Sequence, residues 1–140
     1  MDWKLELVLV PVSDVDRAKT FYTEKVGFNV DVDHRAGDNF RVVQLTPPGS
    51  TCSISIGIGI SPAAPGSAQG LHLVVSDIEA ARAELLARGM DIGEIQHFED
   101  GRMVPGPDPQ RSDYGSYLFF NDPDGNGWAV QEVRRTEPKA

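Results

Sequence analysis

The residue types best suited to chemistry in this 140-residue chain are a few isolated polar side chains, with His72 first among them. A histidine ordinarily gains or loses its proton near neutral pH, so His72 could act as a general acid or base. Gln131 offers an amide that can orient a ligand but cannot accept a proton as a base. Neither of the other histidines, His34 and His97, has the Ser/His/Asp spacing of a hydrolase around it. We therefore expect His72 to be the catalytic residue if the protein is an enzyme, and a structural histidine if it is not.

Alternation along the predicted strands places these polar side chains on one face. Successive side chains of a strand point to opposite faces of its sheet. In GLHLVV, the leucines suit contact with a helix, so His72 and Val74 face the other way; in GWAVQEV, Ala129 and Gln131 do the same. The full set of residues predicted to bind a ligand in a concave cavity is Leu7, Leu9, Ser53, Ser55, His72, Val74 and Gln131. Apolar walls with a few hydrogen-bonding groups suit a small organic molecule.

Two copies of one sequence unit supply the strands that carry these residues. Residues 12–18 (VSDVDRA) are echoed by residues 75–81 (VSDIEAA), and each copy follows an apolar strand. Each copy also opens an amphipathic helix that stops at a glycine, Gly27 or Gly89, where a left-handed backbone costs little. A serine three residues before an acidic residue predicts that Ser13 and Ser76 cap the two helices.

The arrangement predicted from this repeat is an α+β fold with the order βαβββ twice. Strands are expected over residues 28–35, 39–45 and 51–58 in the first copy, and over 93–98, 115–120 and 127–133 in the second. The whole chain, 1–140, is predicted to be one domain, built from module 1 (about 1–58), a linker (59–69), module 2 (about 70–133) and a tail (134–140). Residues 99–114, with three prolines and no periodicity, are expected to form a long loop.

Composition excludes several classes of partner. The chain has 13 Lys and Arg against 21 Asp and Glu, a net charge of −8, which argues against nucleic acid and against anionic membranes. A single cysteine, Cys52, excludes an internal disulfide. With no apolar run of membrane-spanning length and no signal-peptide pattern, a cytoplasmic location is expected.

The repeat and its motifs resemble the vicinal oxygen chelate superfamily of glyoxalases, bleomycin-resistance proteins and dioxygenases. The resemblance rests on residues 12–18 running into Phe21 and Tyr22, on residues 75–81, and on the turn 122–126 (DPDGN). It implies that the two modules curl into an open barrel with the helices outside and the site on the concave inner faces. It also implies a homodimer. The aromatic residues that could serve such an interface, Trp3, Trp128, Phe119 and Phe120, are expected to pack in the core instead.

Enzymes of this superfamily hold a divalent metal on the first and last strands of each module. The positions that match here are Leu7, Gly70, Ala129 and either Ser53 or Ile54, which offer no usual metal ligand. We therefore expect a protein that binds a small molecule without the usual metal and has no cofactor. The alternative is a lyase or isomerase that uses His72, or a metal held by His72 with Glu6 or His97. A domain that serves a partner protein is a third possibility.

Overall fold

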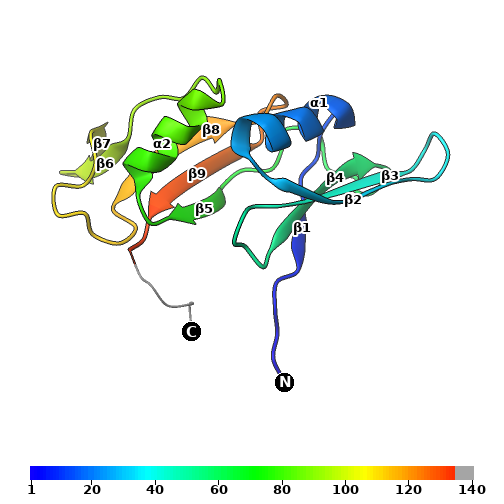
Figure 1. Cartoon of the computed structure of the whole chain (residues 1–140), viewed down its shortest axis with the longest axis horizontal. Coiled ribbons are helices and arrows are strands. Elements are labelled where there is room, and N and C mark those ends of the chain that lie inside the picture. Colours follow the sequence, from blue (N-terminus) through cyan, green and yellow to red (C-terminus); the bar gives the residue numbers. More distant parts are fainter. Residues whose placement is uncertain (135–140) are drawn as a thin grey trace. The chain divides into compact units, whose positions relative to one another are not determined.

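The computed structural model describes residues 1–134, so the predicted tail lies outside the described residues except for Arg134. The chain divides into two compact units (Figure 1). Unit 1 comprises Met1–Gln69 and Asn121–Asn126, and unit 2 comprises Gly70–Phe120 and the chain from Gly127 onward. Each unit contains one mixed sheet and one helical segment, so the predicted α+β fold of two βαβββ-type modules is confirmed. No helix of residues 1–134 is long and apolar enough to cross a membrane.

Unit 1 is built on a four-stranded sheet with the order β1-β4-β3-β2. Its strands are β1 (Leu7–Leu9), β2 (Asn29–Arg35), β3 (Arg41–Thr46) and β4 (Ser53–Ile58). β1 runs parallel to β4, and the other neighbours are antiparallel. One face of β3 and β4 carries four buried apolar residues, as the alternation predicts, next to the buried Arg41, and α1 contacts β4. The residues of this face are Val43, Leu45, Ile54 and Ile56.

The helical segment of unit 1 begins one residue later than the predicted cap. α1 (Val15–Thr20) is capped by Asp14, whose carboxylate accepts the Arg17 N–H, so the prediction of Ser13 as the cap is wrong. The hydroxyl of Ser13 instead donates to the Asp124 carboxylate. The helix continues as a π-helical turn, η1 (Phe21–Val26), and stops at Gly27 with φ +93°, as predicted.

The turn at residues 122–126 is a buried polar cluster that holds unit 1 together. The Asp122 carboxylate accepts hydrogen bonds from the Tyr22 hydroxyl (2.8 Å) and from the Asn126 side-chain amide (2.7 Å). The same Asn126 amide donates to the Pro11 carbonyl, and its oxygen accepts from the Ala68 N–H. The Asp122 and Asn126 side chains therefore have hydrogen-bond partners within unit 1, which gives this turn a structural role.

Unit 2 contains a five-stranded sheet with the order β5-β9-β8-β6-β7. Its elements are β5 (Leu71–Val75), α2 (Ile78–Ala87), β6 (Gln96–Glu99), β7 (Arg102–Pro105), β8 (Ser116–Asn121) and β9 (Gly127–Glu132). β5 runs parallel to β9, and β6 pairs antiparallel with both β7 and β8. The α2 cap is Asp77 and not the predicted Ser76, because the Asp77 carboxylate accepts the N–H groups of Glu79 and Ala80.

The predicted loop 99–114 is wrong over its first part, which forms the β6–β7 hairpin. Asp100 and Gly101 have φ values of +52° and +80°, and Glu99 pairs with Arg102 across them. An Asp-Gly pair with two positive φ values is the two-residue turn that fits the twist of a hairpin. That signal was present in the sequence, but β7 is only four residues long and shows no clear alternation.

Candidate functional site

One face of the unit 2 sheet carries the predicted polar residues, and we call it the open face. Across β5 and β9, His72 pairs with Ala129 and Val74 pairs with Gln131. The residues between them point to the opposite face, where Trp128 and Val130 are 4% and 3% exposed. On the open face, Val74 is 50% exposed and His72 is exposed as well. Four residues named from the sequence, His72, Val74, Ala129 and Gln131, therefore share one face of the sheet.

His72 and Gln131 are joined by a hydrogen bond, and a second bond ties Gln131 to a loop. The distance from His72 Nδ1 to Gln131 Oε1 is 2.9 Å. The Gln131 side-chain Nε2 donates to the backbone carbonyl of Tyr114 at 3.4 Å. Gln131 is 8% exposed, so its amide is held among fixed partners. The arrangement presents the His72 imidazole to the open face in a defined orientation.

A row of aromatic rings on the same face was missed in the sequence. Phe120 stacks on Trp128 on the opposite face (5.8 Å between ring centroids, 4° between planes), so alternation along β8 turns Tyr117 and Phe119 toward the open face. Tyr117 stacks on Phe119 (5.8 Å, 10°) and meets the edge of Phe98 (5.8 Å, 88°). Phe98 is 58% exposed and Phe119 is 47% exposed, which is unusual for large aromatics. We call Phe98, Tyr117 and Phe119 the aromatic row.

The aromatic row lies close to His72 by strand order. β9 separates β5 from β8. The Asp122 N–H bonds to the Asn126 carbonyl, and continuing that antiparallel register places Phe119 opposite Ala129. His72, Ala129 and Phe119 thus lie side by side across three strands, about 10 Å from end to end. Because the side chain of Ala129 is small, it does not project between the imidazole and the phenyl ring.

Of the four aromatic residues that were expected in the core, two are buried and two are exposed. Phe120 and Trp128 are buried, as predicted for the core. Phe119 is exposed on the open face and Trp3 is 88% exposed, so core packing is wrong for these two. The pattern SYLFFN could have located the row, since two adjacent phenylalanines in one strand cannot share a face.

The residues predicted from unit 1 occupy the corresponding strands, β1 and β4. Leu7 pairs with Ser53 and Leu9 pairs with Ser55. The Ser53 hydroxyl is 2.6 Å from the Thr46 hydroxyl and accepts from Gln44 Nε2 at 3.3 Å, and both serines are buried (5% and 2% exposed). Leu9 is 44% exposed. These four residues belong to unit 1, whereas His72, Val74 and Gln131 belong to unit 2.

The residues at the expected metal positions do not fit a divalent ion. Leu7, Gly70 and Ala129 carry no donor atom on their side chains, and the Ser53 hydroxyl is taken up by its neighbours. His97 does not join His72, because it lies on the opposite, buried face with Ser116 and is bonded to the Gly106 carbonyl (2.7 Å). Among residues 1–134, no three His, Cys, Asp or Glu side chains lie close enough together to hold a metal ion.

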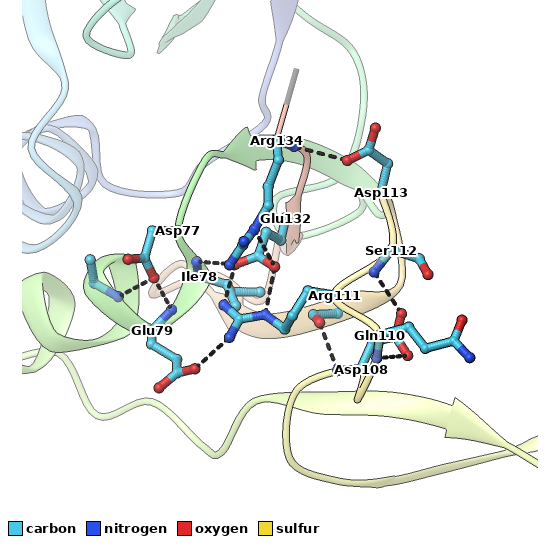
Figure 2. A network of polar contacts seen from close by, with 12 residues as sticks. Asp77, Ile78, Glu79, Asp108, Gln110, Arg111, Ser112, Asp113, Glu132 and Arg134 are labelled. Carbon is cyan, nitrogen blue, oxygen red and sulfur yellow. Dashed lines mark hydrogen bonds and ion pairs between the residues drawn. The ribbon is translucent and has the colours of Figure 1, made fainter. Parts of the chain in front are cut away.

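The loop that supplies the Tyr114 carbonyl is fixed by a buried ion pair (Figure 2). Arg111 binds the fully buried carboxylate of Glu132 through Nε (2.8 Å) and Nη2 (2.6 Å). Glu132 also accepts the Ile78 N–H, which opens α2. The Arg111 guanidinium is the main cause that lowers the pKa of Glu132 to about 2, against the opposing effect of burial.

Two further hydrogen bonds from backbone N–H groups fix the loop, one to a carbonyl and one to a carboxylate. The Tyr114 N–H donates to the Glu132 carbonyl (2.8 Å), and the Arg134 N–H donates to the Asp113 carboxylate (2.9 Å). Tyr114 itself has φ +64°, a strained conformation for a tyrosine that persists only where the surroundings impose it. The loop is therefore a rigid support for Gln131.

Comparison with known proteins places this geometry in a family. The sequence profile of the Glyoxalase/Bleomycin resistance protein/Dioxygenase superfamily matches residues 4–130. The crystal structure of TnmS3, an antibiotic binding protein from Streptomyces sp. CB03234, is 32% identical, covers 94% of this chain and 96% of its own, and has a TM-score of 0.71. A glyoxalase/bleomycin resistance protein from the same organism is also 32% identical, with 92% and 100% of the two chains covered and a TM-score of 0.68.

A curated relative matches over a similar length. The uncharacterized protein YetH of Bacillus subtilis (strain 168) is 27% identical over 126 residues, which are 89% of this chain and 94% of YetH. The profile match spans most of the chain, and two solved structures exceed 30% identity over nearly its whole length. The chain belongs to the Glyoxalase/Bleomycin resistance protein/Dioxygenase superfamily.

Proposed function

We propose that the protein binds a small organic molecule with a planar aromatic body on the open face of unit 2, without a metal ion. The observation that carries the proposal is the aromatic row beside His72. Two of its rings are about half exposed, on a face that also offers a hydrogen-bonding imidazole and amide. A mostly apolar surface with a few convergent polar groups is what small-molecule sites have in common.

The character of the relatives supports a binding role. TnmS3 is described as an antibiotic binding protein, and at 32% identity over 94% of this chain it supports a ligand of the same general kind here. The lack of usual ligands at the metal positions favours binding over the metal chemistry of the superfamily's enzymes. Leu7, Leu9, Ser53 and Ser55 are proposed to contribute the equivalent surface of unit 1.

The energy of aromatic stacking sets the loss of ligand affinity expected when a ring of the row is removed. An aromatic pair contributes about 0.5–1.5 kcal/mol beyond the apolar area that it buries. Removal of the exposed Phe119 ring from the row also removes buried area, so the Phe119→Ala variant should bind about tenfold more weakly. Phe40 is a matched control, because it is 37% exposed, lies in unit 1 away from the open face of unit 2, and meets the edge of the His34 ring.

The test is calorimetric titration of EDTA-treated protein with planar aromatic compounds, 2-naphthol first, and with a cycloaliphatic alcohol of similar size. The proposal predicts binding of the aromatic compound without added metal, weakened in Phe119→Ala and unchanged in Phe40→Ala. No binding of any planar compound, or binding that appears only after a divalent metal is added, would refute it.

A second copy of the chain is the protein partner that we propose. Trp3 and Leu5 are 88% and 70% exposed and lead into β1, which is an edge strand of its sheet. Exposed apolar residues beside an unpaired strand edge favour association. Light scattering should therefore give the mass of a dimer, and the double variant Trp3→Ser, Leu5→Ser should shift it toward the monomer; a wild-type monomer would refute the proposal. We propose a cytoplasmic location for this dimer.

A further inference from the structure

We infer that unit 2 holds His72 as a hydrogen-bond acceptor, and that the site therefore selects ligands that carry a hydroxyl donor beside their aromatic body. The inference names the polar group of the ligand, and its ligand part rests on the proposed function. The part that concerns His72 itself stands on the geometry of the free protein. A chain of two hydrogen bonds leads from the Tyr114 carbonyl through the Gln131 side chain to the His72 imidazole.

The Tyr114 carbonyl decides which way the Gln131 amide points. A carbonyl oxygen only accepts hydrogen bonds, so the group facing it must be the amide nitrogen, as the 3.4 Å distance from Gln131 Nε2 records. The reversed amide would set two oxygens against each other. Because the loop is fixed by the Tyr114 N–H bond to Glu132 and by the Arg111 ion pair, the carbonyl cannot easily turn away.

The amide orientation then decides where His72 carries its proton. Gln131 Oε1 faces His72 Nδ1 at 2.9 Å and can only accept, so Nδ1 must carry the hydrogen. In a neutral imidazole one nitrogen donates and the other accepts, which leaves the lone pair on Nε2. No residue described in unit 2 hydrogen-bonds Nε2, and the side chain is exposed on the open face. A ligand there meets an acceptor.

The position of this acceptor suits a ligand on the aromatic row. His72 and Phe119 lie on either side of Ala129. A planar ligand stacked on Phe119 reaches Nε2 with a polar group at its rim. A ring hydroxyl donates to Nε2, whereas a methyl ether or a carbonyl at the same place has no hydrogen to give. We therefore expect phenols to be preferred over their methyl ethers.

His97 differs from His72 and is kept apart in the experiment. Its Nδ1 lies 2.7 Å from the Gly106 carbonyl and its Nε2 lies 3.2 Å from a Glu99 carboxylate oxygen, so both of its nitrogens face acceptors. Long-range proton–nitrogen NMR spectra of the uniformly ¹⁵N-labelled full chain distinguish the tautomers of neutral histidines at a pH of about 8. The His72 signals are identified by their loss in His72→Gln. The expected result is the Nδ1–H tautomer for His72 in wild type and a shift toward Nε2–H in Gln131→Leu, which cannot accept. Wild-type His72 in the Nε2–H form would overturn the inference.

The ligand part is tested with a matched pair of probes, 2-naphthol and 2-methoxynaphthalene, by calorimetry. Wild type should bind 2-naphthol about tenfold more tightly, because the ether leaves the acceptor unpaired. The preference should shrink to about twofold or less in Gln131→Leu and in His72→Phe. Equal affinities in wild type would overturn the inferred selectivity while leaving the proposed binding function intact. Binding of neither probe would overturn the ligand part, whereas the proposed function is overturned when no planar compound binds; in both cases the NMR spectrum decides the state of His72.

Discussion

The ion pair between Arg111 and Glu132 should be the most sensitive polar contact in unit 2. Glu132 is fully buried, and Arg111 meets it with two bonds of 2.8 and 2.6 Å. Arg134 approaches the same carboxylate from 3.6 Å and is itself 53% exposed. The two arginines thus act on one carboxylate, although Arg111 also binds the exposed Glu79 through Nη1 at 2.8 Å. Arg111→Met keeps much of the apolar stem while removing the charge, and Arg134→Met does the same at the weaker contact.

The unfolding free energy that Arg111→Met should lose follows from the structure in two ways. Removing one partner of a buried ion pair costs about 3–5 kcal/mol, because the other charge is left buried and unpaired. The pKa of Glu132 falls from 4.5 to about 2, chiefly through Arg111, and at 1.36 kcal/mol per unit this corresponds to about 3 kcal/mol. Since Arg111 is partly exposed, the lower end applies, and Arg111→Met should lose about 3 kcal/mol of unfolding free energy. Arg134→Met should lose less than about 1 kcal/mol, as exposed pairs do.

The assay is equilibrium urea unfolding at neutral pH, followed by far-ultraviolet circular dichroism. The free energies of unfolding of wild type, Arg111→Met and Arg134→Met are compared at constant m-value. A loss in Arg111→Met no larger than that in Arg134→Met would refute the reasoning. It would mean that the two short bonds from Arg111 stabilise the buried Glu132 carboxylate no more than the exposed guanidinium of Arg134 does from 3.6 Å.

Three further outcomes are expected. Between pH 4.5 and about 2, wild type should lose the stability that ionised Glu132 contributes, because the folded pKa of Glu132 lies below its unfolded pKa, and the total loss over this range should be smaller in Glu132→Gln. Gly57→Ala should destabilise by about 1–3 kcal/mol, since its Cβ would lie 2.0 Å from the Arg41 carbonyl oxygen. Tyr22→Phe should cost about 1–2 kcal/mol, because the buried Asp122 carboxylate loses its hydroxyl donor.

Each of these has its own measurement and contradicting result. Urea midpoints recorded at several pH values test Glu132, and equal slopes in wild type and Glu132→Gln would contradict the assignment. Gly93→Ala is the control for Gly57→Ala, because nothing lies within 4 Å of its added Cβ, so equal losses in the two variants would count against the steric argument. For Tyr22→Phe, a thermal midpoint unchanged from wild type would show that the Asp122 cluster is satisfied without the hydroxyl.

Much of the fold was predictable because local patterns repeat. The echo of residues 12–18 at residues 75–81 predicted two equal modules, and alternation in β4 predicted which side chains of the strand are buried against the helix. Both helix ends at glycine are as expected, with φ +93° at Gly27 and +85° at Gly89. The N-caps were misplaced by one residue because serine and aspartate cap equally well, and they are adjacent in both copies.

The candidate site was only partly predictable for a different reason. His72 and Gln131 could be placed on one face, since parity within a strand is local. Their hydrogen bond could not be predicted, because it depends on the parallel register of β5 and β9. The Tyr114 carbonyl reaches Gln131 through a loop whose path is set by Arg111 and Glu132, 21 residues apart in sequence. The aromatic row depends likewise on the pairing of β6 with β8.

The most direct test of the central claim, a ligand bound on the open face without a metal, is a nuclear Overhauser spectrum of EDTA-treated protein with 2-naphthol. The account predicts contacts from the naphthol ring protons to the rings of Tyr117 and Phe119, and to the His72 imidazole. Contacts confined to other parts of the chain, or contacts that arise only after a divalent metal is added, would contradict it.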